Sequence, residues 1–172
     1  MRDLFGSDTQ SRKELQRWWE GLEDDRGTRA ELRRCATTLE VMQVPGFHHL
    51  RARLMPLGLS GKTPDDEERD AAQLAVAVAL LAHLEEQSEK KPPPRAFSTG
   101  ASPGDPPPVS PLRFRQVLEA RTPDELLLRL RRVLPLARGL DAIQLAADAF
   151  HWSDRIRKQW VFAYQWPTKQ SA

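Results

Sequence analysis

Apolar residues recur at helical spacing along most of the chain. Leu15, Trp18, Trp19 and Leu22 fall on one face of a helix, and other segments repeat the i, i+3, i+4, i+7 pattern of a helix with one buried side. Val and Ile are few, and no alternation of apolar and polar residues persists, so the pattern contains no strand signal. The sequence therefore predicts an all-α fold.

The starts of the helices are marked by capping residues. A Ser, Thr or Asp followed by proline, or by a Glu or Gln three residues later, satisfies the free N–H groups of a first helical turn. We expect Pro135 to end or kink one helix near Leu134 and Pro167 to stop the last. The long helix that begins at Thr63-Pro64 should run to about Glu86. The other predicted starts are Ser11-x-x-Glu14, Thr28-x-x-Glu31, Pro45, Ser110-Pro111, Thr122-Pro123, Asp141-x-x-Gln144 and Ser153.

Residues 87–110 interrupt this order. They contain Lys90-Lys91-Pro92-Pro93-Pro94 and a stretch rich in Pro, Gly and Ser that ends at Pro106-Pro107-Pro108. Such a composition cannot bury a face or sustain a helix. We interpret it as a flexible or polyproline connector between an N-terminal helical lobe, 1–86, and a C-terminal one, 111–172. A spacer is favoured over a proline-rich docking peptide.

A cluster of arginines opens the predicted helix after Trp18-Trp19. The stretch from Arg26 to Arg34 places four arginines where the helix already carries partial positive charge, so they do not stabilise its start. Leu32, Cys35, Ala36 and Leu39 share the apolar side, while Arg29, Arg33 and Arg34 lie off it. A guanidinium binds phosphate with two hydrogen bonds and keeps its charge, so phosphate is a candidate partner. The alternative is a solvated face, because arginines are abundant throughout.

Basic side chains also flank the apolar faces of two C-terminal helices. Arg129, Arg131 and Arg132 flank the face formed by Leu126, Leu127, Leu130, Val133 and Leu134. In the last helix, Arg155 and Lys158 lie away from the face of Ile156, Trp160, Ala163 and Tyr164, with Arg157 at its border. If these groups converged, they would contact a nucleic-acid backbone without base specificity. The alternative is a set of independent solvated faces.

The charge distribution is uneven although the net charge is only +2. Residues 63–91 carry eight acidic and three basic side chains, whereas residues 111–172 carry six and eleven. This favours a polar surface with one basic side. The single cysteine, Cys35, can form no disulfide within the chain and favours a reduced, cytoplasmic compartment. No leader pattern opens the sequence, and the apolar run from Ala71 to Leu84 is too short to span a bilayer.

Signals for an enzyme are weak. His48 and His49 are adjacent and point to different sides of a helix, and the acidic run Asp65–Asp70 is explained by its place in a first helical turn. No phosphate loop, nucleophile elbow or Cys–His pair is present. We therefore expect no catalytic residue, no metal site and no cofactor.

Five tryptophans are many for this length. Trp18 and Trp160 sit on apolar stripes, which favours packing in the core, and core packing or protein contact is the favoured interpretation for all five. The alternative is a platform on which single-stranded bases stack. Trp19, Trp152 and Trp166 are the candidates for that role.

Taken in order, these segments resemble a known family. The matching stretches run from Arg17-Trp18-Trp19-Glu20-Gly21-Leu22 through the arginine helix and Val44-Pro45-Gly46-Phe47 to Arg113–Ala120, and they continue with Leu130–Leu134, Asp141–Leu145, Asp148, Trp152 and the segment from Trp160 to Tyr164. Together they look like the small subunit of the type I-E CRISPR Cascade complex, the CasB family. The resemblance covers about residues 12–86 and 111–165. The connector 87–110 matches no motif of that family.

This resemblance implies a non-catalytic subunit of an RNA-guided surveillance complex. Family members sit as a pair, pack against the backbone and large subunits, and help to hold the R-loop through contacts to the target DNA, while the guide RNA is involved indirectly. Sequence is read by base pairing, so the protein needs only charge and shape. A scaffold with no nucleic-acid contact is the alternative. The nucleic-acid-binding residues that we expect are Arg34, Arg69, Arg155, Arg157 and Lys158, with Arg131, Arg132, Arg29 and Arg33 as further candidates.

Overall fold

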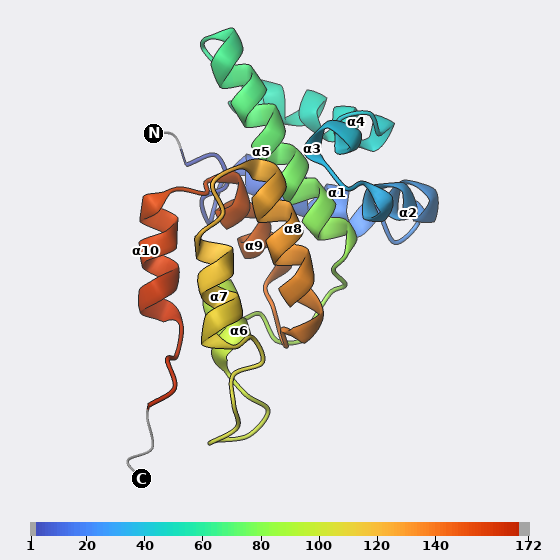
Figure 1. The fold of residues 1–172 in the computed structure, drawn as a ribbon. Coiled ribbons are helices and arrows are strands. Elements are labelled where there is room, and N and C mark those ends of the chain that lie inside the picture. The colour runs from blue at the N-terminus through green and yellow to red at the C-terminus, as the bar shows by residue number, and fades with distance from the viewer. Residues whose placement is uncertain (1–2, 169–172) are drawn as a thin grey trace.

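A computed structural model describes residues 3–168 and shows an all-α protein (Figure 1). Within these residues the only β-type pairing is an isolated bridge between Lys91 and Leu140. The α-helices are α1 (Gln10–Gly21), α2 (Arg26–Arg34), α3 (Thr38–Val41), α4 (Pro45–Leu54), α5 (Pro64–Ala82), α6 (Pro93–Ser98), α7 (Pro111–Leu118), α8 (Pro123–Val133), α9 (Ala142–Phe150) and α10 (Asp154–Ala163), and two 3-10 turns, η1 (Met55–Leu57) and η2 (Leu134–Leu136), follow α4 and α8. The predicted fold class is confirmed.

Most predicted helix starts are confirmed by their caps. The side chains of Thr63, Ser110, Thr122, Asp141 and Ser153 each accept a hydrogen bond from the backbone N–H three residues later. α4 begins at Pro45 and α8 gives way to η2 before Pro135, as the sequence predicts.

Two predicted capping boxes are wrong by two or three residues. The N-cap of α1 is Thr9 rather than Ser11, and that of α2 is Asp25 rather than Thr28. In both cases the side chain of a residue further upstream accepts the hydrogen bond from an N–H of the first turn. The helix therefore begins earlier, and the predicted cap lies inside it. Two helix ends also come earlier than predicted: α5 ends at Ala82 rather than Glu86, and α10 at Ala163, before Pro167 is reached.

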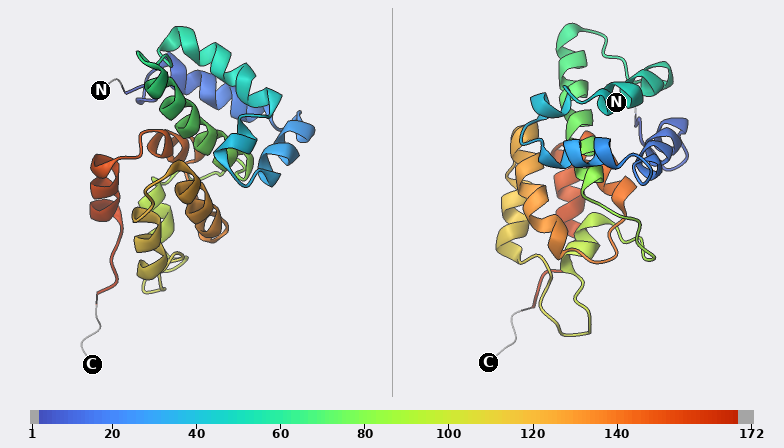
Figure 2. Two further views of the ribbon diagram at one scale, coloured as in Figure 1. Left: turned by 45° about the horizontal axis from the view of Figure 1, so that its top comes forward. Right: turned by 90° about the vertical axis from the view of Figure 1, so that its right-hand side faces the viewer.

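Helix α5 lies at the centre of the molecule. Its residues from Leu74 to Ala82 are all buried, which requires neighbours on every side of the helix. α2 and α3 pack against it from the N-terminal half, and α8 and α9 from the C-terminal half. The views in Figure 2 show these four helices grouped around α5.

Part of the predicted connector is folded. Pro93–Ser98 form α6, in which Ala96 and Phe97 are fully buried, so the expectation that residues 87–110 cannot bury a face or sustain a helix is wrong there. The prolines fit because Pro93 and Pro94 occupy the first turn, where no backbone N–H is needed. Residues 99–108 form a loop whose tip, 101–106, is exposed and whose base is closed by the bond from Val109 N–H to Phe97 O, 2.9 Å.

Side chains from both predicted lobes belong to one hydrophobic cluster of buried residues. The division into 1–86 and 111–172 therefore stays a proposal about the architecture. None of the helices formed by residues 3–168 combines the length and the apolar character needed to cross a bilayer.

Candidate nucleic-acid interface

The arginines of α2 lie beside the C-terminal end of α5. Arg29 donates from Nε to Ala82 O, 3.2 Å, and from Nη2 to Leu84 O, 2.5 Å, and Arg33 donates from Nε to Ala82 O, 2.8 Å. Ala82 is the last residue of α5 and Leu84 lies two residues beyond it, and the last turn of α5 holds no basic residue of its own. The last carbonyls of a helix lack partners within it and carry partial negative charge. Arg29 and Arg33 thus cap α5 and stabilise its dipole.

The apolar stripe predicted for the arginine helix is only partly correct. α2 ends at Arg34 and the chain turns extended at Cys35, so Ala36 and Leu39 leave the helix and are exposed. Leu32 and Cys35 are buried as predicted. Arg34 is exposed and takes part in none of the ion pairs or side-chain hydrogen bonds found among the described residues.

Arg131 connects the end of α2 to α8. Its guanidinium donates to Cys35 O and, at 3.3 Å, to Leu32 O, the last carbonyls of α2. Burial of this side chain lowers the pKa of Arg131, but arginine stays charged at neutral pH. Its neighbour Arg132 is exposed. We call Arg34 and Arg132 the α2–α8 basic pair, because the bonds of Arg131 hold the two helix ends together.

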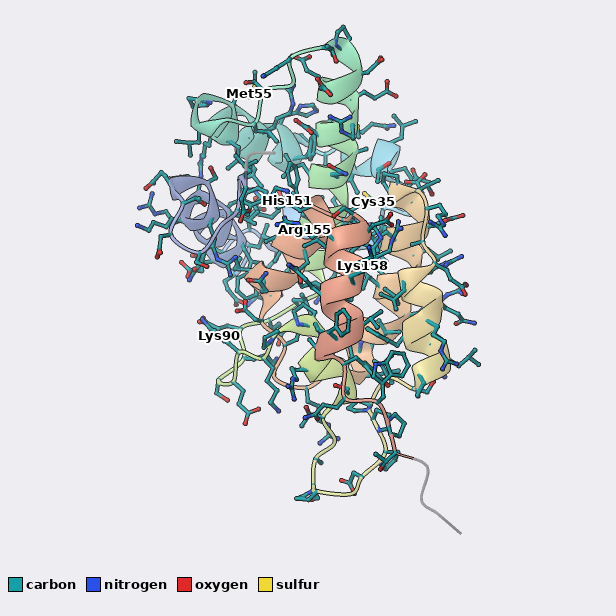
Figure 3. All side chains as sticks on the ribbon, turned by 90° about the vertical axis from the view of Figure 1, so that its left-hand side faces the viewer. Cys35, Met55, Lys90, His151, Arg155 and Lys158 are labelled. Carbon is teal, nitrogen blue, oxygen red and sulfur yellow. The ribbon has the colours of Figure 1, made fainter. Side chains whose placement is uncertain are left out.

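Helix α10 carries a second basic surface. Arg155 and Lys158 are exposed, and Figure 3 shows them with His151 on one face of the molecule. Arg157 is different: it donates to Asp154 Oδ1, 2.7 Å, and to Ala120 O, 3.1 Å, so it fastens α10 to the end of α7. We call Arg155 and Lys158 the α10 basic pair.

A half-buried carboxylate, that of Asp148, fixes the position of α10. Trp160 Nε1 donates to Asp148 Oδ2 on α9 at 2.7 Å, and Gln144 Nε2 donates to Asp148 Oδ1 at 2.8 Å. Burial raises the pKa of Asp148, whereas these two donors favour its ionised form. Because Trp160 is in the core, this bond holds the apolar face of α10 inward and leaves the α10 basic pair in solvent.

Arg69 lines a groove that extends to the N-cap of α10. The groove has a volume of about 590 Å³ and runs between the start of α5, the loop after η1 and the corner between α9 and α10. Lys62, Arg69, Trp152 and Ser153 are among the residues that line it. Arg69 is exposed and forms an ion pair with Asp66 at 2.5 Å.

The exposed cations among the predicted nucleic-acid-binding residues lie on different sides of the molecule. α2 and α10 lie at opposite sides of α5 in both Figure 1 and the left view of Figure 2. Arg69 is on α5, and about 20 Å of this helix separates it from the end that Arg29 and Arg33 of α2 cap. The structure therefore places Arg69 at a groove that also reaches the start of α10, and it fastens the end of α2, where Arg34 lies, to α8 through Arg131, while these two regions are apart.

Sequence reasoning missed the capping role of three arginines. The guanidinium groups of these arginines donate to backbone carbonyls at the ends of other helices: Arg29 and Arg33 to Ala82 O, and Arg131 to Cys35 O. Each carbonyl belongs to a residue at least 49 positions away in the sequence. One signal was present: α5 ends without a glycine or a basic residue of its own, so its carbonyls need donors from elsewhere. Among residues 3–168, no three His, Cys, Asp or Glu side chains gather as ligands for a metal ion.

Taken together, the fold and the surface define an all-helical protein with separate exposed groups of cations. The family model of CRISPR-associated protein Cse2 matches residues 28–164. Because this match covers most of the chain, the protein belongs to the Cse2 family, and the resemblance to the CasB small subunit of Cascade is confirmed at the level of the family. No curated protein and no solved structure matches the chain.

Proposed function

We propose that this protein is a non-catalytic small subunit of a type I-E Cascade complex and acts in antiviral defence. In this role it stabilises the R-loop through contacts between exposed cations and the phosphates of the target DNA. It packs against the backbone and large subunits and against a second copy of itself, and it meets the guide RNA only indirectly, in the cytoplasm and away from membranes. Family membership supports the complex, and the exposed cations support the DNA contact.

The observation that carries the proposal is that the basic side chains divide into two kinds: those that donate to backbone carbonyls of the fold, and those that are exposed. Arg29, Arg33, Arg131 and Arg157 donate to carbonyls of the fold. Arg34, Arg132, Arg155 and Lys158 are exposed and are left out of the ion pairs found among residues 3–168, and Arg69 adds a partly neutralised charge. Phosphate contacts are expected from the free cations, because a capping guanidinium would have to leave its carbonyl first.

Salt dependence separates these two roles. Each phosphate neutralised in duplex DNA contributes about 0.9 to the slope of log K against log salt concentration. We expect the triple substitution Arg34→Gln, Arg155→Gln and Lys158→Gln to lower this slope by about 2 to 3 for each copy of the subunit in the assembled complex, and to weaken R-loop formation while assembly stays intact. The measurement is target-DNA binding by the reconstituted complex across a salt series.

The matched control is Arg33→Gln. It removes the same charge from the same helix as Arg34→Gln, but from a side chain that caps α5, so it should lower the free energy of unfolding by about 1 kcal/mol and leave the salt slope unchanged. If the triple variant keeps the wild-type slope and affinity, the DNA-contact mechanism is wrong and a purely structural scaffold becomes the better account.

A further inference from the structure

The groove beside Arg69 is built from segments far apart in the sequence. The loop after η1 supplies Leu59 and Lys62, α5 supplies Asp70 and Gln73, and the corner between α9 and α10 supplies Trp152. Its volume of about 590 Å³ falls within the range of about 300–1,000 Å³ that is typical of small-molecule sites. A groove of this size can accept a single planar group together with part of its backbone.

The charges of the groove lining balance. Lys62 and Arg69 oppose Asp66 and Asp70, and Asp66 already pairs with Arg69. Burial lowers the pKa of His151, so its ring is neutral at pH 7. A lining without net charge does not favour a phosphate, whereas it suits a neutral ligand with both donors and acceptors.

Trp152 gives the groove an aromatic wall. Its ring is held edge-on against Trp160, with centroids 4.9 Å apart, and the guanidinium of Arg157 lies 5.9 Å from its centroid. The side chain is half-buried, and it lines the groove. A tryptophan held in this way is a rigid surface on which another ring can stack, with little entropy left to lose.

Cations stand at the edge of the groove where a backbone would leave it. Arg155 and Lys158 are exposed on α10 and do not belong to the charge-balanced lining, and Arg155 lines an adjoining hollow that shares His151 with the groove. Phosphates that flank a bound base would meet these side chains. This division, with a charge-balanced lining and an aromatic wall inside and exposed cations on the neighbouring helix, is typical of sites for single-stranded nucleic acid.

We propose that this groove holds one unpaired nucleobase of a single-stranded DNA segment, stacked on Trp152. The inference rests on the proposed contact with DNA and adds a site for a base to it. It also gives a role to Trp152, for which the sequence left core packing and base stacking as alternatives.

The test compares two oligonucleotides with equal phosphate charge, a thymidine oligonucleotide and an abasic one of the same length, binding to the full-length chain at low salt. Base stacking on an aromatic side chain contributes about 1–3 kcal/mol per base, so the wild-type protein should bind the thymidine form roughly tenfold more tightly. Trp152→Leu should bring this ratio close to one. Trp152→Phe, which loses the same indole packing but keeps a ring, should retain most of it.

Two controls identify the site. Trp166→Leu, at an exposed tryptophan away from the groove, should leave the ratio unchanged, and Lys158→Ala should weaken binding of both oligonucleotides equally. A wild-type ratio near one, or a ratio that survives in Trp152→Leu, overturns the base site while DNA binding itself stands. If neither oligonucleotide binds at any salt concentration, alone or in the assembled complex, the proposed function fails together with the base site.

Discussion

His83 lies at the C-cap of α5, close to Arg33, which caps α5, and to Arg131, which caps α2. Burial is the main cause that lowers the pKa of His83 to about 4, and the charges of Arg131 and Arg33 add to it. The ring is therefore neutral in the folded protein at pH 7, and its Nε2 has no hydrogen-bond partner among the described residues. A charged imidazole would add a third cation to this corner.

This depressed pKa predicts a loss of stability in acid. The unfolded chain takes up a proton on His83 near pH 6.5, whereas the folded chain does so only near pH 4. The contribution of His83 is thus complete above pH 6.5 and is lost as the pH falls toward 4. Between pH 7 and pH 5 we expect the wild type to lose about 1 kcal/mol more of its free energy of unfolding than His83→Gln does. This figure allows for solvent screening. Urea unfolding at the two pH values measures it, and a difference that does not change with pH contradicts the assignment.

Individual side-chain roles were the least predictable feature from the sequence. The helical wheel placed Arg29 and Arg33 off the apolar face, which is correct, but solvent and the end of another helix both satisfy that condition. Only the packing of α2 against α5 decides between them. Arg157 was placed at the border of its apolar face, and the structure finds it there, bound to Ala120 O.

The helices themselves were more predictable because their signals are local. A Thr or Ser before a proline fixes a start through one hydrogen bond within four residues, as at Thr63 and Thr122. α6 escaped prediction because composition alone argued against it. Its stability comes from Phe97, which packs edge-on to Trp160 of α10 at a centroid distance of 5.8 Å.

The loop between α6 and α7 allows a test of how it is held. Tyr164 donates from its hydroxyl to Val109 O at 2.6 Å, in a buried site that raises the pKa of Tyr164 to about 12. We expect Tyr164→Phe to lower the free energy of unfolding by about 1–3 kcal/mol, because a buried carbonyl loses its donor.

Replacing residues 101–107 by a shorter Gly–Ser turn should change the free energy of unfolding by less than about 1 kcal/mol, since closure entropy depends weakly on loop length.

Thermal or urea unfolding of both variants measures these effects. The two substitutions act at the base and at the tip of one loop, so each is the control for the other. A large loss of stability on shortening the tip would mean that residues 101–107 carry packing of their own.

At the scale of the whole molecule, the central position of α5 decides how the protein unfolds. Residues Leu74 to Ala82 are buried all round, and neither half of the chain covers them alone. Trp19 donates to Leu81 O at 3.0 Å from the N-terminal half, while Thr38 donates from its backbone N–H to Asp124 Oδ1 at 2.8 Å across the two halves. Removing the C-terminal half would expose the side of α5 that faces α8 and α9.

The two proposed lobes should therefore unfold together. We expect a single transition in urea, coincident when followed by far-ultraviolet circular dichroism and by tryptophan fluorescence, because one cooperative core supports both. A fragment of residues 1–86 should lack a cooperative transition, and adding a fragment of residues 87–172 should restore one. The added fragment serves as the control for chain cleavage itself. Two separate transitions, or a 1–86 fragment that unfolds cooperatively alone, would instead establish independent lobes and make the angle between the two groups of cations adjustable when the complex binds DNA.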